Sequence, residues 1–327
     1  MPGLHPLAPI LLALSSATLF AISIQILHQG LRYTDSETGS LLQILATTIC
    51  YWILAPWLLE SWYWLTPAAL LFAAVGLFKP SVSANASMLG LHYLGPTPTS
   101  TLAASSPLFA AAFGVMFLDE RLTLPIIVGT LAIMAGSVTL AQNGRGQAQR
   151  AWPLWALGLP LLAAFVRASG DGVTKFAMTE LPSPYFAGLV SFSVSLIVAV
   201  CVYGARHRTL PRLGVRYGTG WYFLAGTINA ISVFCLNKAL QLGELIVVVP
   251  IVSASPIITL LISIIFIRRE NITRNSLMAA FLVVPGVVMI SLGRKYHAVL
   301  ELEILSWSRN EVPCLWCFDR PFFSAPG

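Results

Sequence analysis

A few charged side chains lie inside long apolar stretches of this sequence, where charges are otherwise rare. Lys79 stands near the middle of one stretch, about 12 residues, or some 18 Å of helix, from either end. Arg167, Asp171 and Lys175 follow one another at steps of four, a spacing that places them on one face of a helix. If these stretches cross a membrane, each charge costs about 2.5–3.5 kcal/mol at its centre and is expected to face the protein interior. Such side chains can bind a charged ligand, carry a proton or pair with one another.

Each of these charges has a structural interpretation beside a functional one. Lys79 either faces a polar cavity or bonds helix carbonyls near Pro80, because its stem is too short to reach the membrane surface. Arg167, Asp171 and Lys175 either form an internal ion-pair ladder along their helix or leave Asp171 as a proton acceptor. A neighbouring arginine favours the ionised carboxylate, so protonation of Asp171 requires the two groups to separate.

Further polar residues stand in the apolar stretch 221–240. Asn229 lies deep in it and can bond either a ligand or a neighbouring helix. Asn237 and Lys238 adjoin the turn that follows, where Lys238 is expected to extend toward the membrane interface. Lys175 is assigned to a helix end. The charges that remain at membrane depth have a net value of +2, from Lys79, Arg167 and Lys238 against Asp171. This balance favours an anionic or zwitterionic ligand.

The composition explains why these charges stand out. Of 327 residues, 19 are Lys or Arg and 13 are Asp or Glu, so charged residues are 10% of the chain, against about 25% in a soluble domain. Hydrophobic residues make up 57%. So few charges cannot cover a water-soluble globule, which excludes an ordinary soluble enzyme, a nucleic-acid-binding protein and a disordered chain. The sequence therefore predicts a multi-span membrane protein whose surroundings are the lipid bilayer.

Charges and Pro/Gly turns divide the chain into ten apolar stretches of about 20 residues, the length that a transmembrane helix needs. They cover residues 7–28, 38–59, 66–93, 97–118, 122–141, 152–176, 184–203, 221–240, 245–267 and 276–292. All ten are expected to be helices, because lipid offers backbone groups no partner and the stretches lack the alternation of barrel strands. The first is too long for a signal-peptide core and is expected to be retained.

A polar linker, 142–151, separates a first unit, 7–141, from a second, 152–292, and residues 293–327 form a tail without an assigned role. Four matched pairs at offsets of 148–150 residues relate the two units: Gly95 with Gly243, Pro107 with Pro256, Glu120 with Glu270, and Thr123 with Thr273. An odd number of helices in each unit inverts one relative to the other in the membrane. The predicted fold class is an all-α membrane protein of ten transmembrane helices in two inverted five-helix repeats.

One turn pattern occurs in both units. A small or polar stretch precedes a proline (SSP at 105–107, SASP at 253–256), an apolar run follows, and an acidic residue opens the turn (FLDERLT, FIRRENIT). This pattern resembles the EamA-like, ten-helix branch of the drug/metabolite transporter superfamily, over residues 7–292. The second copy departs from the usual pattern, because Arg268 and Arg269 precede its acidic residue.

The resemblance implies a central cavity lined by helices 1, 3, 4, 6, 8 and 9, with both termini in the cytoplasm. It implies a secondary transporter that exports or exchanges small polar metabolites or drugs by alternating access, often driven by an ion gradient. We expect it in the plasma (inner) membrane, as a monomer or homodimer. The charge distribution predicts the opposite orientation: the loops after odd-numbered helices carry most of the arginines, and such loops normally face the cytoplasm.

Combined with the resemblance, these residues become candidates for defined roles. The candidate substrate-binding residues are Lys79, Arg167, Asp171, Asn229, Asn237 and Lys238. Asp171 is also the candidate for proton coupling, and Pro107 and Pro256 are either hinges or static kinks.

No catalytic residue, cofactor or metal site is predicted. The five histidines are scattered, and the C-x-x-C at Cys314 and Cys317 has no second ligand pair. The alternative function is a membrane-embedded enzyme or flippase acting on a lipid-linked substrate. An enzyme would need acid–base or metal groups that converge at one depth.

Overall fold

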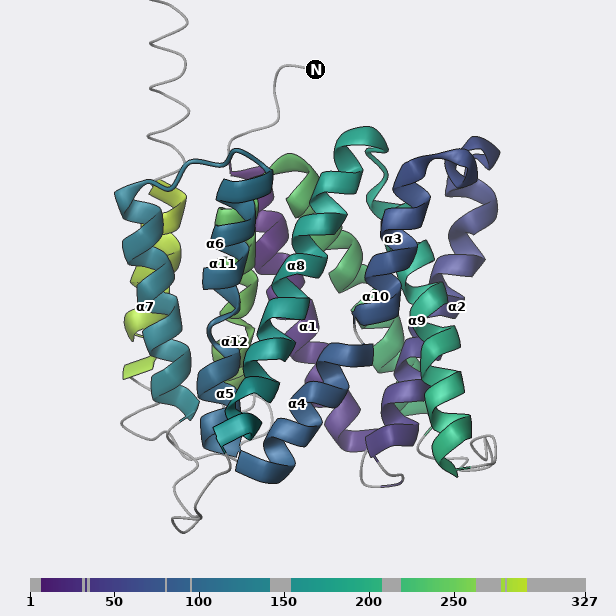
Figure 1. Cartoon of the computed structure of the whole chain (residues 1–327), viewed down its shortest axis with the longest axis horizontal. Coiled ribbons are helices and arrows are strands. Elements are labelled where there is room, and N and C mark those ends of the chain that lie inside the picture. The colour runs from purple at the N-terminus through teal and green to yellow at the C-terminus, as the bar shows by residue number, and fades with distance from the viewer. Residues whose placement is uncertain are drawn as a thin grey trace, which may run out of the picture.

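The regular elements in the described part of the chain are all helices (Figure 1). A helix satisfies its own backbone groups, which lipid cannot do. The computed structural model describes residues 7–30, 33, 36–79, 81–94, 96–141, 154–207, 219–262, 278–279 and 281–292. For these residues the predicted all-α class is confirmed.

The first unit contains α1 (Ala8–Gly30), α2 (Ser36–Leu58), a short 3-10 helix η1 (Ser61–Leu65), α3 (Pro67–Phe78), α4 (Ser81–Leu94), α5 (Pro96–Ala103), α6 (Ser106–Phe117) and α7 (Leu124–Ala141). The second contains a 3-10 helix η2 (Leu154–Leu157), α8 (Gly158–Glu180), α9 (Pro184–His207), α10 (Thr219–Leu242), α11 (Leu245–Ser253) and α12 (Ser255–Ile262). A further apolar helix covers Phe281–Leu292.

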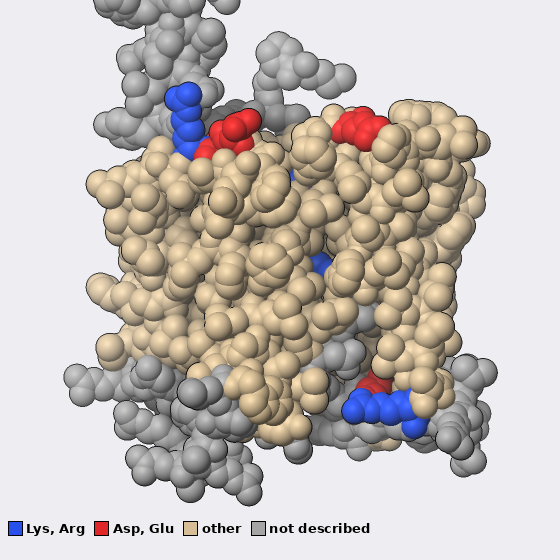
Figure 2. All heavy atoms as spheres, viewed as in Figure 1, with Lys and Arg blue, Asp and Glu red and all other residues tan. Residues whose placement is uncertain are grey.

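Seven helical stretches are long and apolar enough to cross a membrane: Ala8–Gly30, Glu37–Leu58, Thr99–Phe117, Trp155–Glu180, Pro184–Arg206, Thr219–Leu242 and Leu245–Ile262. Three shorter apolar helices are Pro67–Phe78, Leu124–Thr139 and Phe281–Leu292. Figure 2 shows uncharged side chains over most of the height of one face, with acidic and basic side chains gathered at its upper and lower edges. The chain is therefore an integral membrane protein that crosses the bilayer several times.

The two units pack against each other along many of their helices. α1 lies along α10, α2 contacts α9 and α10, and α8 contacts α3, α4 and α6. Small residues permit these approaches: a Cβ at Gly226 of α10 would lie 2.5 Å from the Cβ of Ala46 and 2.8 Å from the backbone oxygen of Gln43, both in α2. Helices in lipid associate through such close contacts, because burial of apolar surface contributes little there.

Three of the predicted helices are interrupted, although two of these stretches, Thr99–Phe117 and Leu245–Ile262, still qualify as single membrane spans. Residues 66–93 form α3 and α4, residues 97–118 form α5 and α6, and residues 245–267 include α11 and α12. A proline stands at or just after each interruption: Pro80, Pro107 and Pro256. Proline has no N–H, and its ring disfavours a helical conformation in the residue before it.

Pro107 and Pro256 are each the second residue of the helix that follows their interruption. At that position the missing N–H removes no bond within the helix. Pro107 is buried and Pro256 is exposed. Several other predicted segments lie outside the described residues, namely the linker 142–151, the tail 293–327 with its C-x-x-C, and the predicted ninth helix beyond Ile262.

Candidate functional site

Lys79 occupies the interruption between α3 and α4. Its backbone N–H donates to the carbonyl oxygen of Val75 (2.8 Å), and its backbone is extended beyond that point, with φ −118° and ψ 125°. The proline that follows cannot donate to the carbonyl of Gly76 four residues before it. The hydroxyl of Ser195 in α9 replaces that donor: its Oγ lies 2.7 Å from the Gly76 oxygen and 2.8 Å from the Lys79 oxygen. Ser195 is fully buried, so α9 stabilises the interruption that presents Lys79.

The Lys79 ammonium group reaches α8 and donates a hydrogen bond to the Asp171 carboxylate, which forms an ion pair between the two units. Both side chains are largely buried, with 26% of Lys79 and 11% of Asp171 exposed. The lysine stem lies beside Gly170, where a Cβ would come within 3.2 Å of Lys79 Cδ. Within the described residues the partner of this lysine is thus a carboxylate of the second unit rather than a helix carbonyl.

Arg167 lies one turn before Asp171 on the same face of α8. Ala164 and Ala168 flank Arg167 on this face and are fully buried, whereas Phe165 on the opposite face is 51% exposed. Arg167 is nevertheless exposed. Because a charged side chain in a membrane span is expected to face the protein interior, we interpret this exposure as a space beside α8 rather than contact with lipid. We call this space, bounded by α8 at Arg167 and Asp171, the Arg167 hollow.

The guanidinium of Arg167 has no hydrogen bond or ion pair within the described residues, although Asp171 is near enough to attract it electrostatically. Figure 2 shows basic atoms recessed at about half the height of the molecule, well away from the charges at its two ends. Two cations, Lys79 and Arg167, therefore lie near one carboxylate, and of the two only Lys79 bonds it.

Asn229, Asn237 and Lys238 of α10 have other partners. The amide of Asn229 is buried and donates to the hydroxyl of Thr47 in α2 (3.3 Å). The amide of Asn237 donates to the first carbonyl of α9 (3.2 Å), and Lys238 bonds a glutamine three residues later in its own helix (2.7 Å). The structure thus brings the charges of α3 and α8 together and bonds these three candidates to helical neighbours.

Lys175 does not take part in the ion-pair ladder that was one of the two interpretations of α8. Its Nζ lies 2.6 Å from Oε1 of Glu120, in the turn between α6 and α7, and it also donates to the carbonyl of Gly243. The two carboxylate oxygens of Glu120 accept the backbone N–H groups of Leu245 (2.7 Å) and Ile246 (2.9 Å), the first residues of α11. Residues four apart in sequence are neighbours on one helix, and that spacing gave no indication that Lys175 would pair with groups outside α8.

The turn that carries Glu120 is shaped for this contact. Asp119 has a φ of 53°, a left-handed conformation that costs a non-glycine residue about 1–2 kcal/mol. A Cβ at Gly114 would lie only 2.7 Å from Oε2 of Glu120, so glycine leaves room for the carboxylate. Sequence reasoning identified Glu120 only as the acidic residue of a repeated turn and missed its partners. The repetition was the available signal that this acidic residue matters.

Replacing Ser195 by alanine is expected to lower the free energy of unfolding by about 1–3 kcal/mol, because the buried carbonyl of Gly76 loses its donor. The measurement is an SDS titration of the purified protein in mixed micelles. Ser169→Ala is the matched control, since that hydroxyl bonds only carbonyls of its own helix. Equal stability of the two variants would show that the interruption does not depend on α9.

The described residues contain no group of three or more His, Cys, Asp or Glu side chains that could hold a metal ion. The cysteines described, Cys50, Cys201 and Cys235, are free thiols.

Comparison with known proteins identifies the family. The model of the EamA-like transporter family matches residues 7–142 and again residues 154–292, which together make up most of the chain. A solved structure described as "Crystal structure of protein" has a TM-score of 0.68, over 88% of this chain and 98% of that one, at 14% sequence identity. That likeness shows a shared fold alone. No curated protein matches the sequence. Because the family model matches both units over nearly their whole length, the chain belongs to the EamA-like transporter family and is a membrane transporter.

Proposed function

We propose that this transporter is an alternating-access permease that carries small polar anions or zwitterions through the Arg167 hollow. The observation that carries the proposal is the exposed guanidinium of Arg167 on the buried face of α8, beside the Lys79–Asp171 ion pair. Two cations and one carboxylate leave one positive charge for a ligand. A guanidinium binds a carboxylate or phosphate through two parallel hydrogen bonds, which favours such groups over neutral polar ones.

Ten transmembrane helices in two inverted five-helix repeats are part of this proposal. The seven long spans and the three shorter apolar helices support this proposal, because together they are ten apolar segments. In secondary transporters, interrupted helices line a site near the middle of the membrane, and their N-terminal ends carry partial positive charge. Figure 1 shows that α4 begins well inside the bundle, and both α4 and α6 pack on α8. The N-terminal ends of these half-helices add to the attraction for an anion.

Proton coupling through Asp171 follows from competition for the two cations. An incoming anion competes with the Asp171 carboxylate for Lys79 and Arg167. A carboxylate that loses its cationic partners takes up a proton more readily. Moving the proton together with the anion limits the net charge that crosses the membrane, which lowers the electrostatic cost of transport.

The proposal is tested by uptake into proteoliposomes, with and without a pH gradient, using panels of carboxylate, phosphate, zwitterionic and cationic solutes. Arg167→Gln is expected to reduce uptake of the best-transported anion about 10–100-fold, the effect of losing a hydrogen bond to a charged group. Arg167→Lys keeps the charge without the planar fork and should retain part of the uptake. Arg206→Gln is the control, because it removes an exposed arginine that pairs with Glu37. Anion uptake unchanged by Arg167→Gln, or selective uptake of cations, would refute the proposal.

A further inference from the structure

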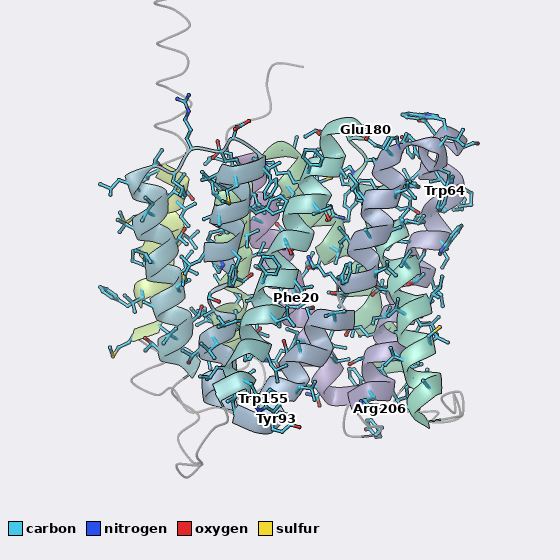
Figure 3. All side chains as sticks on the ribbon, viewed as in Figure 1. Phe20, Trp64, Tyr93, Trp155, Glu180 and Arg206 are labelled. Carbon is cyan, nitrogen blue, oxygen red and sulfur yellow. The ribbon has the colours of Figure 1, made fainter. Side chains whose placement is uncertain are left out.

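The contacts of Glu120 and Lys175 lie at one end of the bundle. Figure 3 places Trp155, Tyr93 and Arg206 at one end and Glu180 at the other. Lys175 is five residues before Glu180 in α8, and it lies about 12 Å beyond Arg167 along the helix axis. The Glu120–Lys175 contact is therefore between the Arg167 hollow and the Glu180 end of the bundle.

This contact joins three parts of the chain that must separate to open that end. Glu120 belongs to the turn after α6 and Lys175 to α8. The backbone partners lie at the α10–α11 turn: Glu120 accepts from the first two residues of α11, and Lys175 donates to Gly243, two residues before that helix. The ion pair thus ties the first unit to two helices of the second. The side chains are 5% and 17% exposed, so water screens their attraction only weakly.

The matching positions in the other repeat lack the groups for such a contact. At the offsets of 148–150 residues that relate the units, Lys175 corresponds to Gln25, Ile26 or Leu27, none of which is charged. The residue that matches Ile246 at an offset of 148 is Pro98, which has no N–H to donate. The matching acidic residue, Glu270, lies outside the described residues. Among the described residues, the repeat therefore offers no second copy of this pair.

We propose that Glu120 and Lys175 form the gate that closes the Arg167 hollow at the Glu180 end. The inference rests on the proposed alternating-access function, since a gate requires a hollow that opens to each side in turn. The Lys175–Glu120 ion pair and the hydrogen bond from Lys175 to Gly243 keep that end shut, and the exposed Arg167 is then reached from the other end. A ligand leaves at the Glu180 end only when this ion pair breaks. At the other end, the ion pair between the units in the described residues is Arg206 with Glu37, which is exposed and therefore weaker, so the resting protein favours the state closed at Glu180.

The gate is tested by the accessibility of a cysteine at position 167. The five natural cysteines are replaced by serine, Arg167→Cys is introduced, and oriented vesicles are treated with a membrane-impermeant methanethiosulfonate from either side. Separate Glu180→Cys and Arg206→Cys proteins establish which end of the bundle each side of the vesicle presents. Thiol labelling requires no substrate, so it reports on the gate independently of transport.

With the gate intact, the cysteine should be labelled from the Arg206 side and not from the Glu180 side. Lys175→Gln is expected to increase the labelling rate from the Glu180 side about tenfold or more, in the range of ordinary coupling between two states. Lys175→Arg keeps the ion pair and should preserve the closed state. Glu120→Gln should behave like Lys175→Gln while still offering an acceptor to α11, so the test does not depend on one variant folding. Arg206→Gln, which breaks the exposed pair with Glu37 at the opposite end, is the matched control and should not increase labelling from the Glu180 side.

Two results would overturn the gate and leave the proposed function standing. In the first, the cysteine is already labelled from the Glu180 side with the ion pair intact. In the second, neither Lys175→Gln nor Glu120→Gln changes the labelling from that side. Absence of labelling from both sides in every variant is a different result. It would mean that the hollow reaches neither surface, and the proposed function would fail together with the gate.

Discussion

Lys79→Ala is expected to lower the free energy of unfolding by about 3 kcal/mol, because it removes the hydrogen-bonded partner of the buried Asp171 carboxylate and leaves only the electrostatic attraction of Arg167. The same variant should reduce anion uptake about a hundredfold. The double variant Lys79→Met/Asp171→Leu replaces the ion pair with apolar side chains, which is often neutral for stability. It should therefore recover most of the lost stability and none of the uptake. SDS unfolding titrations and proteoliposome uptake of the best-transported anion measure the two effects.

This pair of variants separates folding from transport. If the ion pair serves only to hold α3 against α8, the double variant should recover anion uptake together with stability. Lys79→Arg keeps the positive charge and should retain measurable uptake, which makes it the matched control. Anion uptake unchanged in both Lys79→Ala and Lys79→Arg would show that Lys79 does not contribute to an anionic site.

Glu120→Ala is expected to destabilise the protein by about 3–5 kcal/mol, since it breaks a buried ion pair by removing one partner. Lys175 would keep only its hydrogen bond to the Gly243 carbonyl, and the first two N–H groups of α11 would lose their acceptor. Glu180→Ala, an exposed carboxylate at the same end of the bundle, is the control and should have little effect. The measurement is again unfolding in mixed micelles. A loss below about 1 kcal/mol, the value of an ordinary single hydrogen bond, would show that the Glu120 contacts form without contributing to stability.

The candidate site was only partly predictable from the sequence. Lys79, Arg167 and Asp171 could be singled out because a charge in an apolar stretch is costly in any membrane fold and must face the interior. Their pairing could not be predicted. Lys79 and Asp171 are 92 residues apart, and Lys175 and Glu120 are 55 residues apart, so no local spacing relates them. Pro80, Pro107 and Pro256 were the local sequence signal for the helix interruptions. The hydrophobic pattern did not indicate them, because apolar residues continue on both sides of each proline.

The sequence by itself determined that this chain is a helical membrane protein made of two related units. The evidence for this came from the scarcity of charge, the length of the apolar stretches and the repeated motifs. These features belong to single helices or to the order of residues along the chain, so they do not depend on how the helices pack. Only the tertiary structure decided which charges pair, that Arg167 is exposed on the buried face of α8, and that Glu120 bonds α8 and α11. Those properties depend on which helices lie side by side, because an ion pair forms only where two groups separated in sequence are brought within a few ångströms.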